Sequence, residues 1–280
     1  MNREDGIGVI SVDNGGSSTC VVTRNTEEWF PSVKALYGER TLTTVKGKKD
    51  FIVEYKGEKY IMGTLAKYDS VMPLQMHTES KQNLFYDLSI LVAIHQYGFL
   101  DNYLVTCVPV SMHNDIEKKG LYERLVKSHT IKVNGISRTF RISDLRVAAE
   151  GASAYWIDEP RGIARFLDIG SRTINFVTTL NEDGINRYLD SQSGVFFGQG
   201  IEALGNNYNS KGLSDFIGGR LFAKGWKRED QLFLLGGGAL DKHLVEFIRD
   251  YFPLAKVIDD PVMANSKGMF QLGRHAYQMN

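Results

Sequence analysis

The feature that most constrains this chain is a pattern that occurs once in each half. Residues 9–22 (VISVDNGGSSTCVV) place an aspartate and two glycines between two apolar, β-branched runs, and residues 162–180 repeat this order. FLDIGS at residues 166–171 echoes SVDNGG at residues 11–16. Internal repeats can define a fold, because each copy builds the same supersecondary unit. The sequence therefore predicts two similar halves, each with a strand, a glycine turn and a second strand.

Each glycine turn has two interpretations. Turns of the Asp-Gly type are common in ordinary hairpins. Alternatively, glycine lets the backbone approach a phosphate closely, so that backbone N–H groups surround it. An aspartate at that place would repel the phosphate, so its expected role is to hold a hydrated Mg²⁺ that bridges phosphate oxygens. A single turn favours the ordinary hairpin, whereas two turns favour a cleft in which Asp13 and Asp168 approach one metal ion from opposite sides.

The other predicted elements alternate between strands and helices, which indicates an α/β layered fold. Two further hairpins are expected at Lys56-Gly57 and Asn134-Gly135, and residues 103–110 read as a strand buried on both faces. Apolar spacing predicts helices over residues 80–97, 115–128, 214–225, 239–252 and 264–278.

Composition excludes some classes of protein. The 280 residues carry 33 basic and 33 acidic side chains, which argues against direct nucleic-acid binding through bulk charge. Cys20 and Cys107 lie in separate apolar runs and are expected as buried thiols in a reducing compartment. No leader-like start or membrane-length apolar run is evident, so we expect a soluble, cytoplasmic protein without membrane contact. The histidines lack metal-ligand spacing and are expected at the surface or at an interface: His77, His95, His113, His129, His243 and His275.

Three further stretches bear on nucleotide chemistry. LLGGGA ends a strand with Gly236, Gly237 and Gly238, a turn that suits an anion or a flat base. GQGIEA matches G-x-G-x-x-A at residues 198–203, but a dinucleotide site needs a βαβ unit there, and NNYNSKG interrupts it. Glu150 stands between a strand-like and a helix-like run. It could orient a water for attack on a terminal phosphate, or it could simply favour a helix N-terminus.

Together these stretches resemble the actin-like ATPases, and specifically the ParM-like branch of bacterial plasmid-segregation proteins. SVDNGGSST resembles the first phosphate hairpin, RVAAEGASAY the connecting segment with its catalytic glutamate, and FLDIGSRTINF the second phosphate hairpin. LLGGGA resembles the adenosine motif and DPVMANSKGMFQLG the closing P-x-x-A-N-x-x-G element. Five such elements in the family's order cover the length of the chain.

The resemblance implies a role for particular residues. Asp13 and Asp168 would organise Mg²⁺, and Glu150 would position the attacking water; these three form the implied catalytic set. The nucleotide, ATP or possibly GTP, would contact the two hairpins and the glycine turn at Asn14, Gly15, Gly16, Ser17, Ser18, Gly170, Ser171, Arg172, Thr173, Gly236, Gly237 and Gly238. Relatives often carry a lysine late in the first hairpin, where this chain has Cys20.

The resemblance also implies a duplicated, ribonuclease H-like two-domain fold with a nucleotide cleft. Domain I would span residues 1–152 with a small IB insertion at about 30–80. Domain II would span residues 153–280, with the C-terminal helix near the hinge. Only 35 residues separate Gly200 from Gly236, so subdomain IIB should be reduced or absent, as in the short form AlfA.

The implied function is nucleotide-dependent polymerisation. Head-to-tail contacts that do not close propagate as a filament, and hydrolysis of the nucleotide would weaken it. The implied partners are further copies of the chain and a DNA-binding adaptor bound to a centromere-like plasmid site. Two other functions stay open, namely a small-molecule kinase on the same scaffold and a nucleotide-binding adaptor that does not hydrolyse its ligand.

Overall fold

The computed structural model of the chain describes residues 6–39, 47–70 and 80–279, and His77 lies outside them. The chain divides into two compact units. Unit 1 contains Met1–Thr106, Asn114–Val147 and Gly273–Asn280, and unit 2 contains Cys107–His113 and Ala148–Leu272. The division between domains that the sequence predicts at residues 152 and 153 stays a prediction.

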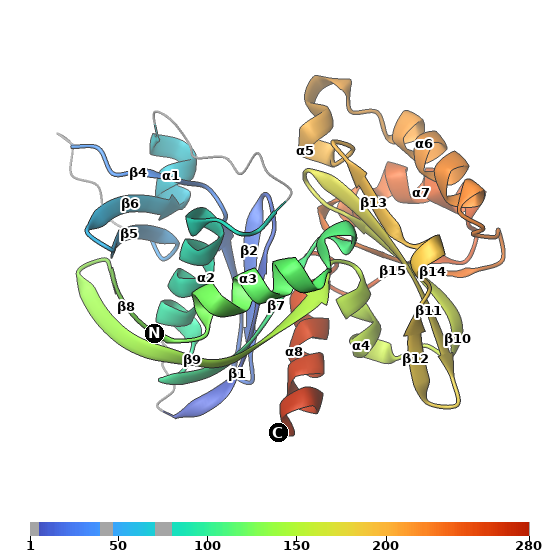
Figure 1. Cartoon of the computed structure of the whole chain (residues 1–280). Helices are drawn as coiled ribbons and strands as arrows, with labels where there is room; N and C mark the ends of the chain where they lie inside the picture. Colours follow the sequence, from blue (N-terminus) through green and yellow to red (C-terminus); the bar gives the residue numbers. More distant parts are fainter. Residues whose placement is uncertain (1–5, 40–46, 71–79, 280) are drawn as a thin grey trace. The chain divides into compact units, whose positions relative to one another are not determined.

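Unit 1 is built on a nine-stranded sheet with the order β3-β2-β1-β7-β9-β8-β5-β6-β4 (Figure 1). Its strands are β1 (Ile7–Asn14), β2 (Ser18–Thr23), β3 (Thr26–Pro31), β4 (Lys34–Leu36), β5 (Asp50–Tyr55), β6 (Glu58–Gly63), β7 (Asp101–Val108), β8 (Ser128–Val133) and β9 (Ile136–Ala149). Its helices are α1 (Thr64–Asp69), α2 (Leu84–Tyr97) and α3 (Asp115–Leu125). The last two residues of β7 and of β9 already belong to unit 2.

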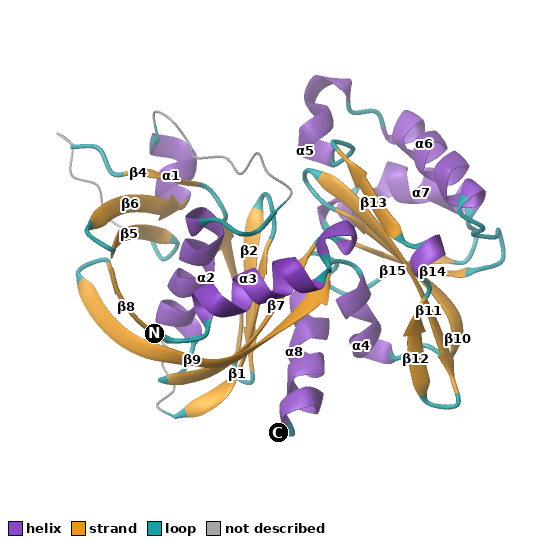
Figure 2. Cartoon of the chain, in the orientation of Figure 1, coloured by secondary structure: helices purple, strands orange, loops and turns teal. Residues whose placement is uncertain are grey.

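Unit 2 contains a six-stranded sheet with the order β12-β11-β10-β14-β15, and β13 pairs with β11 off this path. Its strands are β10 (Gly162–Ile169), β11 (Thr173–Glu182), β12 (Ile185–Tyr188), β13 (Gly194–Phe197), β14 (Gln231–Leu235) and β15 (Ala255–Val257). Its helices are α4 (Tyr155–Asp158), α5 (Ile201–Leu204), α6 (Ser210–Ala223), α7 (Lys242–Tyr251) and α8 (Ala264–Tyr277), and α8 ends in unit 1 (Figure 2).

The first four strands of the two sheets follow one plan. In unit 1, β3, β2 and β1 form an antiparallel meander and β7 joins β1 in parallel; in unit 2, β12, β11, β10 and β14 do the same. The central strands β1 and β10 are buried on both faces, which explains their nearly continuous apolar sequences. The internal repeat predicted from the sequence is therefore confirmed as a repeated supersecondary unit.

Local signals in the sequence explain where several elements begin and end. The side chain of Asn83 accepts a hydrogen bond from Tyr86 N at the start of α2, and Gly98 follows its end. Asn134 and Gly135 have φ of 51° and 84°, the left-handed pair that a two-residue hairpin turn requires. The hairpins of β5 with β6 and β8 with β9 lie where the sequence predicts them.

Helix packing supplies the core of each unit. In unit 1, α2 packs against β1, β2 and β8. In unit 2, α6 and α7 pack against each other, and buried side chains of both helices form one cluster with Phe176 and Leu234 of the sheet and with Trp226, which follows α6. Every residue from 201 to 235 is described, and these residues form only short helices, α6 and β14 before the Gly236 turn. The predicted reduction of subdomain IIB is thus confirmed.

The expectation for the histidines is wrong at two positions. His95 and His129 are buried in unit 1, with 0% and 4% of their surface exposed. Each ring is accommodated because Nε2 contacts a backbone carbonyl, that of Ile136 for His95 and that of Leu125 for His129, both at 2.9 Å. His113, His243 and His275 are exposed as expected. Cys20 and Cys107 are buried and form no disulfide, as predicted.

Candidate functional site

The first glycine turn closes the hairpin of β1 and β2 in unit 1. Gly15 N donates to Ser18 O at 3.0 Å, and Asn14 pairs with Thr19 across the strands. Asp13 lies one residue before the end of β1, opposite Cys20, and is partly exposed. The turn residues Gly15 to Ser18 are all at least partly exposed, so their backbone N–H groups lie at the surface of unit 1.

The side chain of Asn14 is used inside the protein. It is 1% exposed, and its Oδ1 accepts from Thr19 Oγ1 at 3.1 Å and from Ser32 Oγ at 3.3 Å. Its Nδ2 donates to Tyr86 O at 3.5 Å. Asn14 therefore joins β1, β2, the end of β3 and helix α2, and these contacts hold the first hairpin in place.

A lysine that no sequence motif indicates lies against this hairpin. Lys81 is buried, and its Nζ donates to Asn14 O at 3.3 Å. Two side chains of α3 fix the backbone of Lys81, because Lys81 N donates to Glu117 Oε1 at 2.6 Å and Arg124 Nη2 donates to Lys81 O at 3.0 Å. Lys81 is 67 residues away from Asn14 in the sequence, so spacing alone could not reveal the contact.

The second glycine turn, in unit 2, has the same backbone geometry. Gly170 N donates to Thr173 O at 3.0 Å, and Ile169 pairs with Ile174 across β10 and β11. Asp168 again lies two residues before the glycine, here opposite Asn175 and only 7% exposed. The residues from Gly170 to Thr173 are partly exposed.

Two carboxylates of unit 2 are each held by a neutral amide. Asn265 Nδ2, in the first turn of α8, donates to Asp168 Oδ2 at 2.8 Å. Asn175 Nδ2 donates to Glu150 Oε2 at 2.9 Å, and Glu150 is 8% exposed. In both cases the donor is an uncharged amide, which orients the carboxylate without adding a positive charge.

The connection after Glu150 brings this glutamate next to the second hairpin. Gly151 has φ of 81°, and a Cβ there would lie 3.5 Å from Asp168 Cβ. Asn265 Oδ1 accepts from Gly151 N at 2.9 Å and from Ser153 Oγ at 2.8 Å. Asn265 thus links the segment of Glu150 to Asp168. Asn265 belongs to the sequence DPVMANSKGMFQLG, in which spacing alone assigns it no role.

The three-glycine turn packs directly on the second hairpin. Gly236 has φ of 80°, and a Cβ there would overlap Asp168 Oδ1 and lie 2.6 Å from Ile169 O. A Cβ on Gly238 would overlap the side chain of Ile169, whereas Gly237 has open space around it. Gly236 N donates to Pro261 O at 2.8 Å, which ties the turn to the segment that leads into α8.

The GQGIEA stretch has a different role from a dinucleotide fingerprint. β13, which leads into it, pairs antiparallel with β11. Gly200 N donates to Arg172 O and Ile201 N to Gly170 O, both at 3.1 Å, and a Cβ on Gly200 would overlap the backbone of the turn. Glycine is needed there because the start of α5 satisfies the carbonyls of the second hairpin.

The comparisons with known proteins agree with this architecture. Residues 11–152 match the sequence family described as "Actin like proteins N terminal domain", which is half of the chain. This chain is an actin-like protein. No curated protein sequence matches it significantly.

Solved structures show the same fold over nearly the whole actin-like chain. A filament of AlfA from a B. subtilis plasmid has a TM-score of 0.76 at 18% identity, with 94% of this chain and 97% of that chain covered. A 15-stranded ParM filament from Clostridium botulinum has a TM-score of 0.76 at 17% identity, covering 98% and 100%. An archaeal actin homologue in complex with ADP has a TM-score of 0.75 at 19% identity, also covering 98% and 100%. The predicted actin-like fold is confirmed.

The described residues lack two kinds of feature. They contain no group of three or more His, Cys, Asp or Glu side chains arranged to hold a metal ion. Among their helices, none combines the length and the apolar character needed to cross a membrane.

Proposed function

We propose that this actin-like protein binds a nucleoside triphosphate, ATP or GTP, through its glycine hairpins and assembles into filaments when it does so. The observation that carries the proposal is the repetition of one hairpin geometry. In each copy a glycine N–H closes the turn at 3.0 Å and an aspartate stands two residues earlier. Such turns suit a Mg²⁺-bound chain of phosphates, because each offers backbone N–H groups for phosphate oxygens and a carboxylate for the metal ion.

The nucleotide would be bound by the residues that the resemblance implies. Gly15, Gly16, Ser17 and Ser18 of the first turn, and Gly170 to Thr173 of the second, would contact the phosphates. Gly236 to Gly238 would lie beside the adenosine or guanosine. Lys81 adds a positive charge at the first hairpin, where the lysine of the relatives is replaced by Cys20.

Asp13 and Asp168 would hold a Mg²⁺ ion that arrives with the nucleotide. Mg²⁺ in nucleotide sites commonly uses one or two carboxylates together with phosphate oxygens and water. The partly exposed carboxylate of Asp13, and that of Asp168, fixed through one oxygen by Asn265, fit this donor set. When bound, the ion would neutralise phosphate charge.

Glu150 is the proposed base that orients the attacking water. Its carboxylate is buried and is fixed by Asn175, whose Oδ1 accepts from Val110 N at 3.3 Å. Asn175 is therefore the proposed positioning residue, since its amide orients the carboxylate of Glu150. Positioning and charge neutralisation then provide the catalysis, with little covalent work by the protein.

Light scattering and pelleting with ATP, GTP or no nucleotide test this proposal when phosphate release is measured in the same samples. We expect scattering to rise only with nucleotide. Scattering that never rises would contradict filament formation. Assembly without phosphate release would favour the non-hydrolysing adaptor, and release that requires an added acceptor alcohol would favour a kinase.

Glu150→Gln tests the catalytic assignment. The glutamine oxygen can still accept from Asn175, so the variant should fold and assemble. A general base typically contributes a factor of about 10² to 10⁴, and we expect phosphate release to fall by at least about a hundredfold. Glu229→Gln, an exposed change in unit 2, is the matched control. Unchanged release in Glu150→Gln would disprove the role of Glu150.

The plasmid role belongs to the same proposal. Assembled copies of the chain would be linked to a centromere-like site by a DNA-binding adaptor in the cytoplasm. The support comes from the resemblance to the ParM-like branch and from the balanced charge of the chain, which gives it no strong field of its own to hold DNA.

A further inference from the structure

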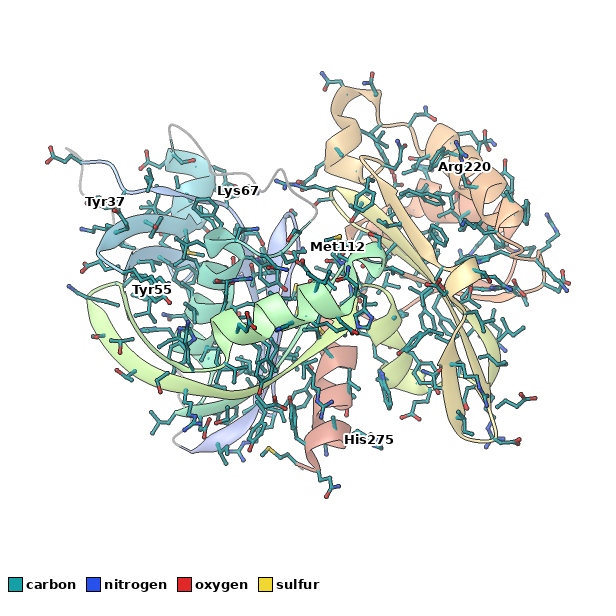
Figure 3. The ribbon with its side chains drawn as sticks, viewed as in Figure 1. Tyr37, Tyr55, Lys67, Met112, Arg220 and His275 are labelled. Carbon is teal, nitrogen blue, oxygen red and sulfur yellow. The ribbon has the colours of Figure 1, made fainter. Side chains whose placement is uncertain are left out.

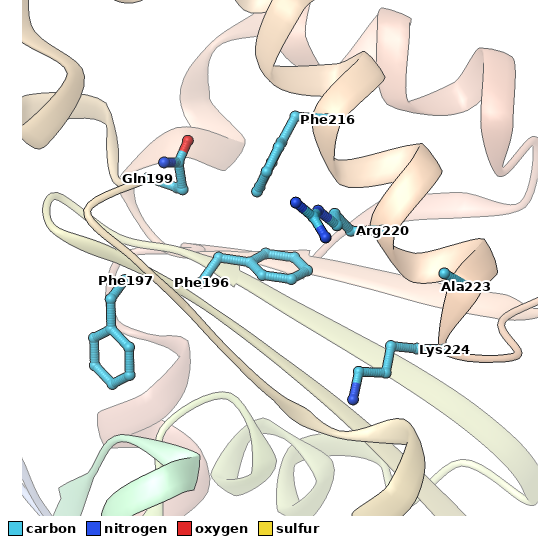
Figure 4. A pocket seen from close by; sticks show the side chains of 7 residues that line it. All are labelled: Phe196, Phe197, Gln199, Phe216, Arg220, Ala223 and Lys224. Carbon is cyan, nitrogen blue, oxygen red and sulfur yellow. The ribbon is translucent and has the colours of Figure 1, made fainter.

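An aromatic groove lies on unit 2 between β13 and α6 (Figure 4). It has a volume of about 410 Å³, and we define it by Phe196, Phe197, Gln199, Phe216, Arg220 and Lys224. The rings of Phe196 and Phe216 meet edge to face at 5.2 Å between centroids. Both rings are partly exposed, whereas the ring of Phe197, 37% exposed, points to the other side of β13 (Figure 4). The groove therefore offers apolar surface that unit 2 itself does not cover.

The rim of the groove is positively charged. Arg220 and Lys224 are both exposed and lie one helical turn apart at the C-terminal end of α6. The guanidinium of Arg220 lies 5.6 Å from the centre of the Phe216 ring. The residues that line the groove include no acid, so its charge favours an occupant that combines apolar and acidic side chains.

A surface of that chemistry lies elsewhere on unit 2, at the turn between β11 and β12. We call it the acidic turn and define it by Ile163, Leu180, Glu182, Asp183 and Ile185. Glu182 pairs with Ile185 and Leu180 with Ile163, so these four side chains share one face of the sheet. Ile163 and Ile185 are 45% and 53% exposed, which is unusual for isoleucine.

The backbone makes the acidic turn a rigid projection. Asp183 and Gly184 have φ of 55° and 74°, the values of a two-residue type I′ turn. Glu182 and Asp183 at its end are both exposed. Arg187 is on the same face but opposes Leu180, two pairs further from the turn than the pair of Glu182 and Ile185. The end of the hairpin thus carries two acids beside one exposed isoleucine.

The groove and the acidic turn lie at opposite ends of unit 2. Arg220 marks α6 in Figure 3, and the β11–β12 turn lies at the far end of the same unit in Figure 1. Two different complementary surfaces at opposite ends of one body form a heterologous contact, which adds copies in one direction without closing. Two cations and the rings of Phe196 and Phe216 on one surface match two acids and exposed isoleucines on the other.

We propose that the acidic turn of one copy inserts into the aromatic groove of the next copy and forms a longitudinal contact of the filament. The inference rests on the proposed function, because it names the surfaces through which assembly occurs. The groove is also joined to the second hairpin. Gln199 precedes Gly200, whose N–H bonds to Arg172 O, so phosphate bound at that hairpin would order one wall of the groove.

Charge reversal provides the test. We take Arg220→Glu with Lys224→Glu as the groove variant and Glu182→Lys with Asp183→Lys as the turn variant. Each variant alone places like charges across the contact, and we expect the critical concentration for pelleting with nucleotide to rise at least about tenfold. Lys242→Glu with Lys256→Glu, also exposed residues of unit 2, is the control for the change in net charge.

A mixture of the groove variant and the turn variant is the decisive test of the contact. In the mixture, the acidic turn of the groove variant can meet the unchanged cationic groove of the turn variant. The second contact is also complementary, because the turn variant carries lysines at its turn and the groove variant carries glutamates in its groove. The equimolar mixture should therefore pellet as an alternating copolymer at close to the wild-type concentration. A mixture that stays soluble, or single variants that pellet like wild type, would overturn the inference.

Nucleotide binding separates this inference from the proposed function. A fluorescent nucleotide analogue should bind both variants within about twofold of wild type, because neither set of substitutions touches the hairpins. Wild-type protein that binds no nucleotide or never pellets would overturn the proposed function. If the wild-type protein pellets with nucleotide and both variants pellet equally well, only the proposed contact between the acidic turn and the aromatic groove is overturned.

Discussion

The two glycine hairpins have the same backbone geometry, but different kinds of contact support them. The first is held by a side-chain cluster in which Asn14 accepts from Thr19 and Ser32. The second is surrounded by backbone, since Gly200, Gly236 and Gly238 approach it so closely that a Cβ at any of them would overlap it. A side-chain cluster can relax around a substitution, whereas packed backbone cannot, so substitutions among the residues that surround the second hairpin should be the more damaging.

The two hairpins also differ in the residue that supplies positive charge. The second turn contains its own cation, Arg172, whereas the first hairpin receives Lys81 from a segment fixed by α3. Repetition of the backbone therefore did not require repetition of the surrounding residues. Different substitutions can therefore disrupt the first and the second glycine hairpin separately.

Gly236→Ala should have the largest effect. Its Cβ would overlap Asp168 Oδ1 and press on Ile169 O, and φ of 80° is unfavourable for alanine. We expect a loss of about 3 kcal/mol in the free energy of unfolding, measured by urea denaturation. Gly237→Ala, with open space around it, is the control and should change stability by less than about 1 kcal/mol. Equal losses would show that the packing of Gly236 is unimportant.

Lys81→Met should weaken nucleotide binding by about tenfold, or roughly 1.4 kcal/mol, because a buried cation beside the first hairpin is lost. Lys34→Met is the matched control, since Lys34 is also buried and donates through Nζ, to Phe85 O at 2.6 Å. Titration with ATP and with adenosine measures the effect. Only ATP affinity should fall, and an equal loss for adenosine would refute a phosphate-specific role.

Acid should destabilise unit 1 before unit 2. Burial lowers the pKa of His129, and its Nε2–H donates to Leu125 O, so the folded state holds the neutral ring. Stability is fully present above the unfolded pKa of about 6.5 and is lost as pH falls through the lower folded pKa, by at most about 1.4 kcal/mol per pH unit. In the described part of unit 2, both histidines, His113 and His243, are exposed.

Thermal unfolding between pH 7.5 and 5 measures this dependence. His129→Gln should flatten the acid side of the profile, and His243→Gln should leave it unchanged. A profile that is identical in all three proteins would mean that His129 does not control the acid sensitivity of unit 1.

Gly15→Ala and Gly170→Ala should have the smallest effects, and these should be equal. In each case the new Cβ would lie 3.1 Å from the carbonyl that closes the turn, that of Ser18 or of Thr173. Both should cost about 1 kcal/mol of stability, measured by urea denaturation of the two variants side by side. A difference of more than about 1 kcal/mol would indicate that the two turns are not equivalent.

Much of the fold follows from short-range patterns in the sequence. Alternation, continuous apolar runs and Asn134-Gly135 depend on neighbours within a few residues, so the predicted hairpins and helices are found in the structure. Glu150 was predicted to lie between a strand and a helical turn, and it follows β9 and precedes Ala152–Ala154. The burial of His95 and His129 was missed, because a histidine is accommodated by carbonyls that the sequence does not reveal.

The sequence by itself determined the duplicated strand–turn–strand unit and the positions of its glycines and aspartates, because turn chemistry is local. Only the tertiary structure decided what surrounds each turn. Lys81, Asn175 and Asn265 are polar residues of ordinary kind in the sequence, and their contacts join segments that are far apart in the chain. Such contacts depend on how strands and helices pack, which is a property of the whole fold and leaves no fixed spacing in the sequence.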